Sequence, residues 1–289
     1  MAVIITNNEH EIPKPTPPPA RYGFFNVATP MGDAGERVIA SGLQFVAEDC
    51  GIQVVPYNPT CAAPHDSKVF TPGTPIVDAS PYWLVSSYQC GTVGTTAADV
   101  RRRVTARYQA GVQHAVENVV WTGGGLVGQN PALTTAGATV VVPTAAGAGA
   151  AISALEEAFY DAHGYVGTIH VNQRATGALA YADVLDRVEL GAWKTPLGSR
   201  VSLGAGYGIT GPAAAAPAAG FVWAFMTPQV YYWSSAVNQP DPVQTLDRSL
   251  NQWMALAETV YAHAWLCDTV FAVQVPIAAP ATAATPAPV

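Results

Sequence analysis

The stretch PYWLVSSYQCGTVGTTAADVRRRVTARYQAGVQHAVENVVWTGGG, residues 81–125, decides the fold of this chain. It begins with Tyr82–Tyr88, a run rich in aromatic residues that predicts a buried strand. Thr96 followed three residues later by Asp99 is typical of a capping box at the start of a helix. The three glycines that follow Thr122 are typical of a helix end. The sequence therefore predicts one strand followed by one long helix, from Thr96 to Trp121.

Apolar residues recur along this predicted helix at the spacing of a single face. Roughly 25 residues at 1.5 Å each give a rod of about 37 Å. We predict that the apolar face is buried and that the helix lies across the folded chain. The residues of this face are Val100, Val104, Tyr108, Val112, Val116 and Val119.

Arginines cluster in the first turns of the same helix, where the helix dipole disfavours cations. Two interpretations stay open. The arginines either form a solvated face with local pairs, or they meet acidic groups on another chain. The four residues are Arg101, Arg102, Arg103 and Arg107.

The composition is unusually poor in charge. Asp, Glu, Lys and Arg make up 11% of the residues, against roughly 25% in an ordinary soluble domain. Hydrophobic residues make up 49%, beside 26 glycines. A monomer needs a solvated surface, so this composition indicates that much of the surface is buried against other chains. A bias towards Ala, Gly and Pro inherited from a GC-rich genome is the alternative, and both can hold.

Two long stretches carry no charge, residues 118–155 and 201–240. Glycines and prolines interrupt both, so neither reads as a membrane-spanning helix. The N-terminus has no basic segment followed by an apolar core and is not predicted to be a signal peptide. We expect a protein that is made and kept in the cytosol.

The four cysteines, Cys50, Cys61, Cys90 and Cys267, form no Cys-x-x-Cys pair. In a reducing compartment they are expected to be free thiols. A zinc site built on Cys61 and His65, with Cys50 and one distant cysteine, is an alternative, but the spacing matches no known ligand pattern. The net charge of −7 argues against a dedicated nucleic-acid binder. No metal or other cofactor is predicted.

No catalytic constellation emerges from the sequence. The Gly-x-Gly-x-x-Gly pattern at 123–128 follows a helix and meets no acid at the required distance, so it is interpreted as a turn. His114 and Glu117 share a helix face and are interpreted as a surface pair. His163 lies near a helix end. His170 is the one candidate base in the interior, and a hydrogen-bonded core histidine is the favoured interpretation. No catalytic, cofactor-binding or metal-binding residue is predicted.

The segments before the strand are rich in proline. Residues 1–21 favour an extended arm, which is either a tail or a strap laid over a neighbouring chain. Gly42–Pro81 contains only short β-rich pieces, Gln53–Tyr57 and Lys68–Phe70, and is interpreted as a long two-stranded projecting loop. The last residues, 278–289, are an Ala, Pro and Thr tail of low complexity.

After the long helix, shorter elements alternate. Leu246–Ile277 is ambiguous, because Leu250, Trp253 and Ala257 fit a helix while the density of Trp, Tyr, Val and Thr fits two long strands. The other predicted elements are helices at Ala150–His163 and Ala175–Val188 and strands at Val166–Val171, Ser199–Leu203 and Phe221–Ala236.

Taken in order, these elements resemble the Hong Kong 97-type major capsid protein of tailed bacteriophages, in its actinobacteriophage-like branch. Residues 81–125 look like its strand and spine helix. GYVGTIHVNQRATGALA (164–180) looks like the axial-domain strand and the helix that follows. FVWAFMTPQVYYWSS (221–235) and NQWMALAETVYAHAWLCDTVFAVQVPI (251–277) look like the closing strands, which favours strands at the ambiguous segment.

The resemblance covers residues 20–277 and implies an α+β fold with five parts. They are an N-terminal arm (1–24), an entry segment with the extended loop (25–80), a peripheral domain (81–135 and 245–279, with the spine helix at 96–121), an axial domain (136–244) and a loose C-terminal tail (280–289). The long helical scaffolding segment that begins some relatives has no counterpart here.

The resemblance also implies a function without catalysis. The chain is expected to assemble with itself into hexamers and pentamers of an icosahedral virion shell, in the host cytoplasm, around double-stranded DNA that it contacts weakly and non-specifically. Scaffolding, portal and decoration proteins are possible partners, and no membrane is expected. The alternatives are an encapsulin-type nanocompartment shell and, from another class, a soluble hydrolase with an unrecognised site.

Overall fold

A computed structural model describes most of the chain between residues 21 and 277. No helix within the described ranges is both long and apolar enough to cross a membrane. The described ranges are 21–32, 34–47, 50–51, 76–125, 131–135, 137–187, 192–240, 246–267 and 269–277.

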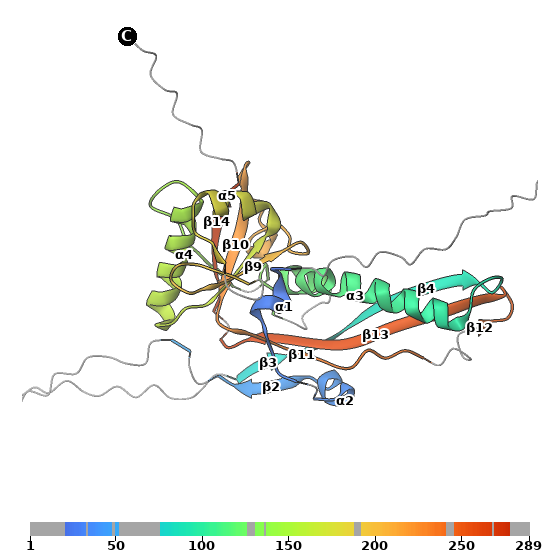
Figure 1. Cartoon of the computed structure of the whole chain (residues 1–289). Helices are drawn as coiled ribbons and strands as arrows, with labels where there is room; N and C mark the ends of the chain where they lie inside the picture. The colour runs from blue at the N-terminus through green and yellow to red at the C-terminus, as the bar shows by residue number, and fades with distance from the viewer. Residues whose placement is uncertain are drawn as a thin grey trace, which may run out of the picture.

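A five-stranded sheet and one long helix form the elongated part of the molecule (Figure 1). The two long strands β4 and β13 pair antiparallel from Pro81 opposite Ala262 to Gly91 opposite Gln252. The helix α3 runs along this pair. The elements are β1 (Thr29–Pro30), β4 (Pro81–Gly91), α3 (Ala97–Thr122), β11 (Val230–Ser234), β12 (Leu246–Asp247) and β13 (Gln252–Trp265).

The predicted ends of the long helix are confirmed. Thr96 Oγ1 accepts a hydrogen bond from the Asp99 backbone N–H, and the Asp99 carboxylate accepts one from the Thr96 N–H, so the capping box is complete. At the other end Gly123 adopts φ 79°, in the left-handed region that glycine enters without a steric penalty. A 3-10 turn, Gly123–Gly125, follows, which confirms the turn predicted there.

The buried face of α3 is the predicted one, with one exception. Val104, Tyr108 and Val116 are buried, and Val104 packs with Ala255 and Ala257 of β13. Val112 is only half-buried. It packs at the margin of two separate core clusters, one under each half of the helix, and so lies between them.

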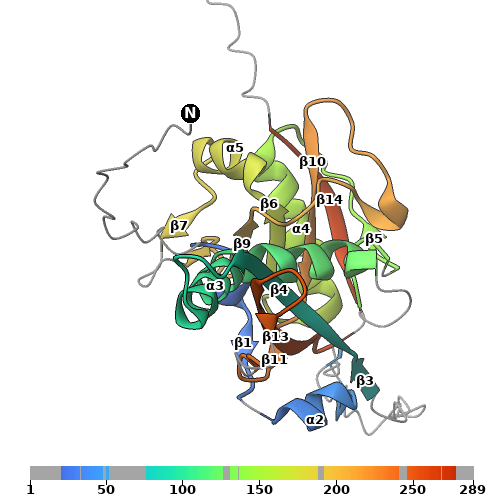
Figure 2. The same ribbon diagram turned by 90° about the vertical axis from the view of Figure 1, so that its right-hand side faces the viewer.

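The second sheet has seven strands and lies at the C-terminal end of α3 (Figures 1 and 2). Its strand order is β5-β14-β10-β6-β9-β8-β7, and α4 packs against it, with α5 beside α4. The elements are β5 (Thr139–Val140), α4 (Ala148–His163), β6 (Thr168–Asn172), α5 (Thr176–Tyr181), β7 (Asp186–Arg187), β8 (Trp193–Lys194), β9 (Arg200–Gly204), β10 (Phe221–Thr227) and β14 (Phe271–Pro276), with 3-10 turns at Gln173–Ala175 and Pro212–Ala214.

Two helices of this part differ in how well they were predicted. The helix α4 buries Ile152, Leu155 and Phe159 as expected and stops at Gly164. The helix predicted at Ala175–Val188 is shorter, because α5 ends at Tyr181. Asp183 then takes φ 53°, which turns the chain into the edge strand β7.

The chain crosses between the two sheets twice near its end. The predicted run Phe221–Ala236 is two strands, because Pro228 has no N–H to donate to a ladder. Strand β10 before it belongs to the seven-stranded sheet and β11 after it to the five-stranded sheet. Leu246–Ile277 forms strands throughout its regular part, and β13 and β14 likewise belong to different sheets.

The base of the predicted projecting loop is a two-stranded sheet. Strands β2 (Leu43–Val46) and β3 (Ile76–Ala79) pair antiparallel. With the short helix α2 (Glu36–Ala40) they cover the side of β13 that faces away from α3, where they bury Val260, Ala262 and Ala264. The pieces predicted at Gln53–Tyr57 and Lys68–Phe70 lie outside the described residues.

The start of the described chain belongs to the core. The short helix α1 (Phe24–Val27) places Phe24, fully buried, in the cluster that contains Trp121. The predicted arm therefore ends in a core residue, and residues 1–20 lie outside the described part.

The expectation of free thiols is wrong for two cysteines. Cys50, after β2, and Cys267, after β13, form a disulfide across 217 residues of sequence. Their proximity depends on how the loop base docks on β13, which sequence spacing does not reveal. Cys90 is free and half-buried, and Cys61 lies outside the described residues, as does His65. In the described part no three His, Cys, Asp or Glu residues are grouped to hold a metal ion.

Candidate functional site: a buried carboxylate and two apolar surfaces

Glu117 is a buried carboxylate at the junction of three elements. One oxygen accepts hydrogen bonds from the Phe24 N–H (3.0 Å) and from Gln113 Nε2 (2.8 Å), and the other accepts from the Gly206 N–H (2.8 Å). Glu117 thereby ties α1 and the segment after β9 to α3. The predicted surface pair with His114 is wrong: His114 is exposed, whereas Glu117 points inward.

Glycines make the approach of this segment to α3 possible. A Cβ on Gly206 would collide with the His114 carbonyl oxygen, which is backbone and cannot move aside. A Cβ on Gly204 would lie 2.8 Å from the carboxyl carbon of Glu117. The alternation Gly204-Ala-Gly206-Tyr-Gly208 is the sequence signal for this close approach. It does not identify the partner, because Glu117 lies nearly 90 residues away in the sequence.

His170 is a hydrogen-bonded core histidine, as predicted. Its ring nitrogens lie 3.0 Å from Tyr207 Oη and 3.0 Å from Thr227 Oγ1, and Tyr207 Oη lies 2.9 Å from Ser202 Oγ. All four side chains are buried. A general base has to reach a proton of its substrate, and this network is closed to solvent, so it serves packing.

Burial lowers the pKa of His170 to about 3 and that of His263 to about 4, from an ordinary value of 6.5. In both cases desolvation of the charged ring is the main cause. Below pH 6.5 the unfolded chain binds protons that the folded chain does not. Stability that is present above pH 6.5 is therefore lost as the pH falls towards 4, by up to about 1.4 kcal/mol per pH unit for each histidine.

We expect the melting temperature to fall between pH 6.5 and 4, and the fall to be shallower in His263→Gln. The glutamine can still donate to the Pro131 carbonyl, which His263 Nε2 approaches at 3.0 Å, but it does not titrate. Thermal melts at half-unit pH steps measure the slope. His114→Gln, at an exposed position, is the control and should keep the wild-type slope. Equal slopes in all three proteins would contradict the assignment.

The arginines of α3 make contacts within the chain. Arg101 donates to the backbone carbonyls of Gln239 and Pro240, at 3.4 and 3.3 Å. Arg102 pairs with Asp99 at 3.0 Å, and Arg103 donates to Tyr88 Oη at 2.7 Å. The guanidinium of Arg107 lies over the Tyr88 ring, 4.7 Å from its centroid. The contacts of Arg102, Arg103 and Arg107 support the interpretation as a solvated face with local pairs, whereas Arg101 is half-buried and contacts a distant segment.

The outer sheet face, defined as Trp83, Val85, Met254 and Leu256, is the first of two uncovered apolar surfaces. Along β4 the side chains alternate, so Tyr82 and Leu84 pack inward while Trp83 and Val85 are 52% and 58% exposed. The prediction that Tyr82–Tyr88 forms a buried strand is therefore wrong for one of its two faces. Met254, 42% exposed, and Leu256 continue this face on β13. Polar side chains interrupt this face, because Glu258 stands opposite Val85 and Ser87 stands opposite Leu256. Exposed apolar residues gathered on one face mark interaction surfaces in soluble proteins.

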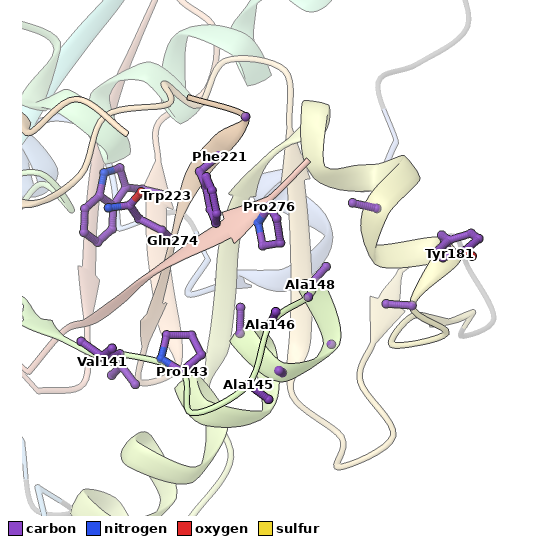
Figure 3. A pocket seen from close by; sticks show the side chains of 18 of the residues that line it. Val141, Pro143, Ala145, Ala146, Ala148, Tyr181, Phe221, Trp223, Gln274 and Pro276 are labelled. Carbon is purple, nitrogen blue, oxygen red and sulfur yellow. The ribbon is translucent and has the colours of Figure 1, made fainter. Parts of the chain in front are cut away.

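The second apolar surface is a pocket of about 850 Å³ at the far end of the seven-stranded sheet (Figure 3). The ends of β10 and β14 contribute Phe221 and Pro276, the segment before α4 contributes Pro143, and α5 contributes Tyr181. No charged residue is among those that line it. Tyr181 at its rim is largely exposed, so the apolar surface continues outside the pocket.

Comparison with known proteins identifies the fold. No family model and no curated protein matches this sequence. Among solved structures, the capsid of the native GTA particle aligns with 96% of this chain and 99% of its own, at a TM-score of 0.54 and 11% identity. A Gordonia phage Cozz structure covers 96% and 92% (TM-score 0.50, 14% identity). The structure of phage G major capsid and decoration proteins covers 93% of each chain (TM-score 0.50, 11% identity).

The chain therefore has the fold of capsid shell proteins, since 93–96% of it aligns with nearly the whole length of such structures. More specifically, the fold is that of phage major capsid proteins, the Hong Kong 97-type fold that the sequence predicted.

Proposed function

We propose that this chain is the structural subunit of an icosahedral phage head. Copies of it associate into hexamers and pentamers that enclose double-stranded DNA. One observation carries the proposal: nearly the whole of this chain aligns with nearly the whole of each capsid chain.

The surface chemistry supports self-association. With 11% charged residues, the chain has few groups to keep an isolated surface in water. The outer sheet face and the apolar pocket lie at opposite parts of the molecule, which suits a subunit with several neighbours. A buried apolar area stabilises by about 25 cal/mol per Å², so these surfaces favour assembly without any cofactor.

The net charge of −7 suits a wall that encloses DNA without adhering to it. Strong phosphate binding depends on clustered Lys and Arg.

We propose residues 81–135 and 245–279 as the peripheral domain, 136–244 as the axial domain and 1–24 as the arm. The virion shell is the proposed location, with assembly in the host cytoplasm. Scaffolding, portal and decoration proteins are proposed further partners.

The purified chain, alone or with its scaffolding partners, is expected to form closed shells visible by negative-stain microscopy. Trp83→Glu combined with Val85→Glu should lower the yield of shells at least roughly tenfold, since carboxylates on a buried apolar contact are poorly tolerated. Circular dichroism should show an unchanged subunit. Val93→Glu, at a position that is 91% exposed, is the matched control and should assemble normally. A protein that stays monomeric at high concentration under every condition contradicts the proposed function.

Removal of residues 1–20 tests the arm. The stretch holds the apolar residues Val3, Ile4, Ile5 and Ile12 among its prolines. Extended segments of this kind gain stability by lying along a neighbour. We expect a folded subunit with a melting temperature within about 2 °C of wild type, but shells that are fewer, malformed or fragile. The deletion stops before Phe24, so the core is untouched. Normal shells would show that the arm is only a tail.

A further inference from the structure

The Cys50–Cys267 disulfide lies where the chain passes from the five-stranded sheet to the seven-stranded sheet. Cys267 follows β13 in the short segment by which the chain leaves the five-stranded sheet for β14 of the seven-stranded sheet. Cys50 follows β2, at the base of the predicted projecting loop. The bond therefore fastens the loop base directly to the crossing between the two sheets.

The loop base depends on side-chain packing and on the disulfide for its position. Strands β2 and β3 form a sheet of only two strands, joined by four residue pairs. Such a hairpin is marginal in water unless it packs on something larger. Here Val77 and Ala79 pack on the outer side of β13, and the Phe45 ring centroid lies 6.3 Å from that of Tyr231 and 6.2 Å from that of Trp233 on β11. The disulfide is the covalent addition to these contacts.

The two sulfurs differ in access. Cys267 is buried at 2% exposure, with Tyr165 Oη 3.9 Å from its sulfur, whereas Cys50 is only half-buried. Thiol–disulfide exchange requires a thiolate to reach a sulfur in line with the bond. Exchange with small molecules therefore proceeds at Cys50, which forms the mixed disulfide, and Cys267 is the thiol that resolves it.

We infer that this pair is a redox-controlled staple of the loop base, open while the chain is in a reducing cytosol and closed once the shell leaves it. The oxidant is a low-molecular-weight disulfide such as oxidised glutathione. The Cys50 thiolate attacks it and releases one reduced thiol. The Cys267 thiolate then displaces the second thiol, so two protein thiols become one disulfide and the oxidant becomes two thiols. The time at which the disulfide closes rests on the proposed function, whereas the effect of the disulfide on the loop base does not.

Hydrogen exchange tests the staple on the full chain. Adding reductant should speed amide exchange in Leu43–Val46 and Ile76–Ala79 at least roughly tenfold, while α3 and the β4–β13 pair keep their protection. Cys90→Ser should respond like wild type. Cys50→Ser should already exchange fast at the loop base and should not respond to reductant. A wild-type loop base that exchanges equally in both states overturns the staple.

Thiol counting tests the timing. Cells expressing the chain are lysed into an alkylating reagent, and the mass of the denatured chain gives the number of modified cysteines. All four should react in this extract, and two after the purified protein has been treated with oxidised glutathione. If only two cysteines were modified in the alkylated cell extract, the disulfide would already have formed in the cytosol, and the proposed timing would be overturned. Failure to form shells would count against the proposed function and leave the exchange result in force.

The closed staple should also be visible in the melt. Oxidised wild-type protein should melt roughly 5–10 °C above its reduced form, since a cross-link over a long loop constrains the unfolded chain. Oxidised and reduced Cys50→Ser should melt at one temperature. If reductant lowered the melting temperature of Cys50→Ser as much as that of wild type, the stabilisation would not come from the Cys50–Cys267 disulfide. That result would overturn the proposed staple.

Discussion

Val104→Asp should leave the chain unable to reach its folded state. Val104 is fully buried between α3 and β13, against Ala255 and Ala257. The change removes the burial of a valine side chain, about 1.5–3 kcal/mol, and places a carboxylate among the apolar side chains of this cluster. We expect a loss of at least about 4 kcal/mol in the free energy of unfolding, a large share of the stability of a typical domain.

The test is expression and thermal melting of three matched variants. Val112→Asp, on the same helix but half-buried, should cost clearly less, because its carboxylate can reach water. Val93→Asp, just before the helix and 91% exposed, should melt with wild type. A soluble Val104→Asp that melts normally would show that α3 does not pack on β13 by this face.

Glu117→Ala should destabilise the chain by about 3–5 kcal/mol. The carboxylate is the acceptor for two backbone N–H groups, those of Phe24 and Gly206. Each buried donor left without a partner costs about 1–3 kcal/mol, and the alanine also leaves an unfilled volume. The effect should be largest at α1 and the segment after β9, which Glu117 holds against α3.

Glu117→Gln separates the contribution of the two carboxylate oxygens as hydrogen-bond acceptors from the contribution of the side-chain volume. The amide fills the same volume but replaces one carboxylate oxygen with an NH2 group, which faces a donor in either orientation. We therefore expect glutamine to recover only part of the loss. Glu157→Ala, on the exposed side of α4, is the control. Denaturant unfolding at neutral pH measures all three. Wild-type stability in Glu117→Ala would mean that water replaces the carboxylate without cost.

The sequence alone determined the elements whose signals are local. The capping box at Thr96, the glycine stop at Gly123 and the apolar spacing along α3 lie within a few residues of the structure they specify. For the same reason α4 and the strand β4 were predicted near their observed bounds. The order of these elements was sufficient for the resemblance to a capsid protein.

Only the tertiary structure decided the features that depend on distant partners. The sequence predicts Glu117 as a surface residue, whereas in the structure the segment after β9 brings Gly206 against it. Cys50 and Cys267 look unrelated until the loop base docks on β13. The first contact requires the segment after β9 to pack on α3, and the second requires the loop base to pack on β13. No local pattern carries that information, because the energy of such contacts depends on burial, which exists only once the sheets have formed.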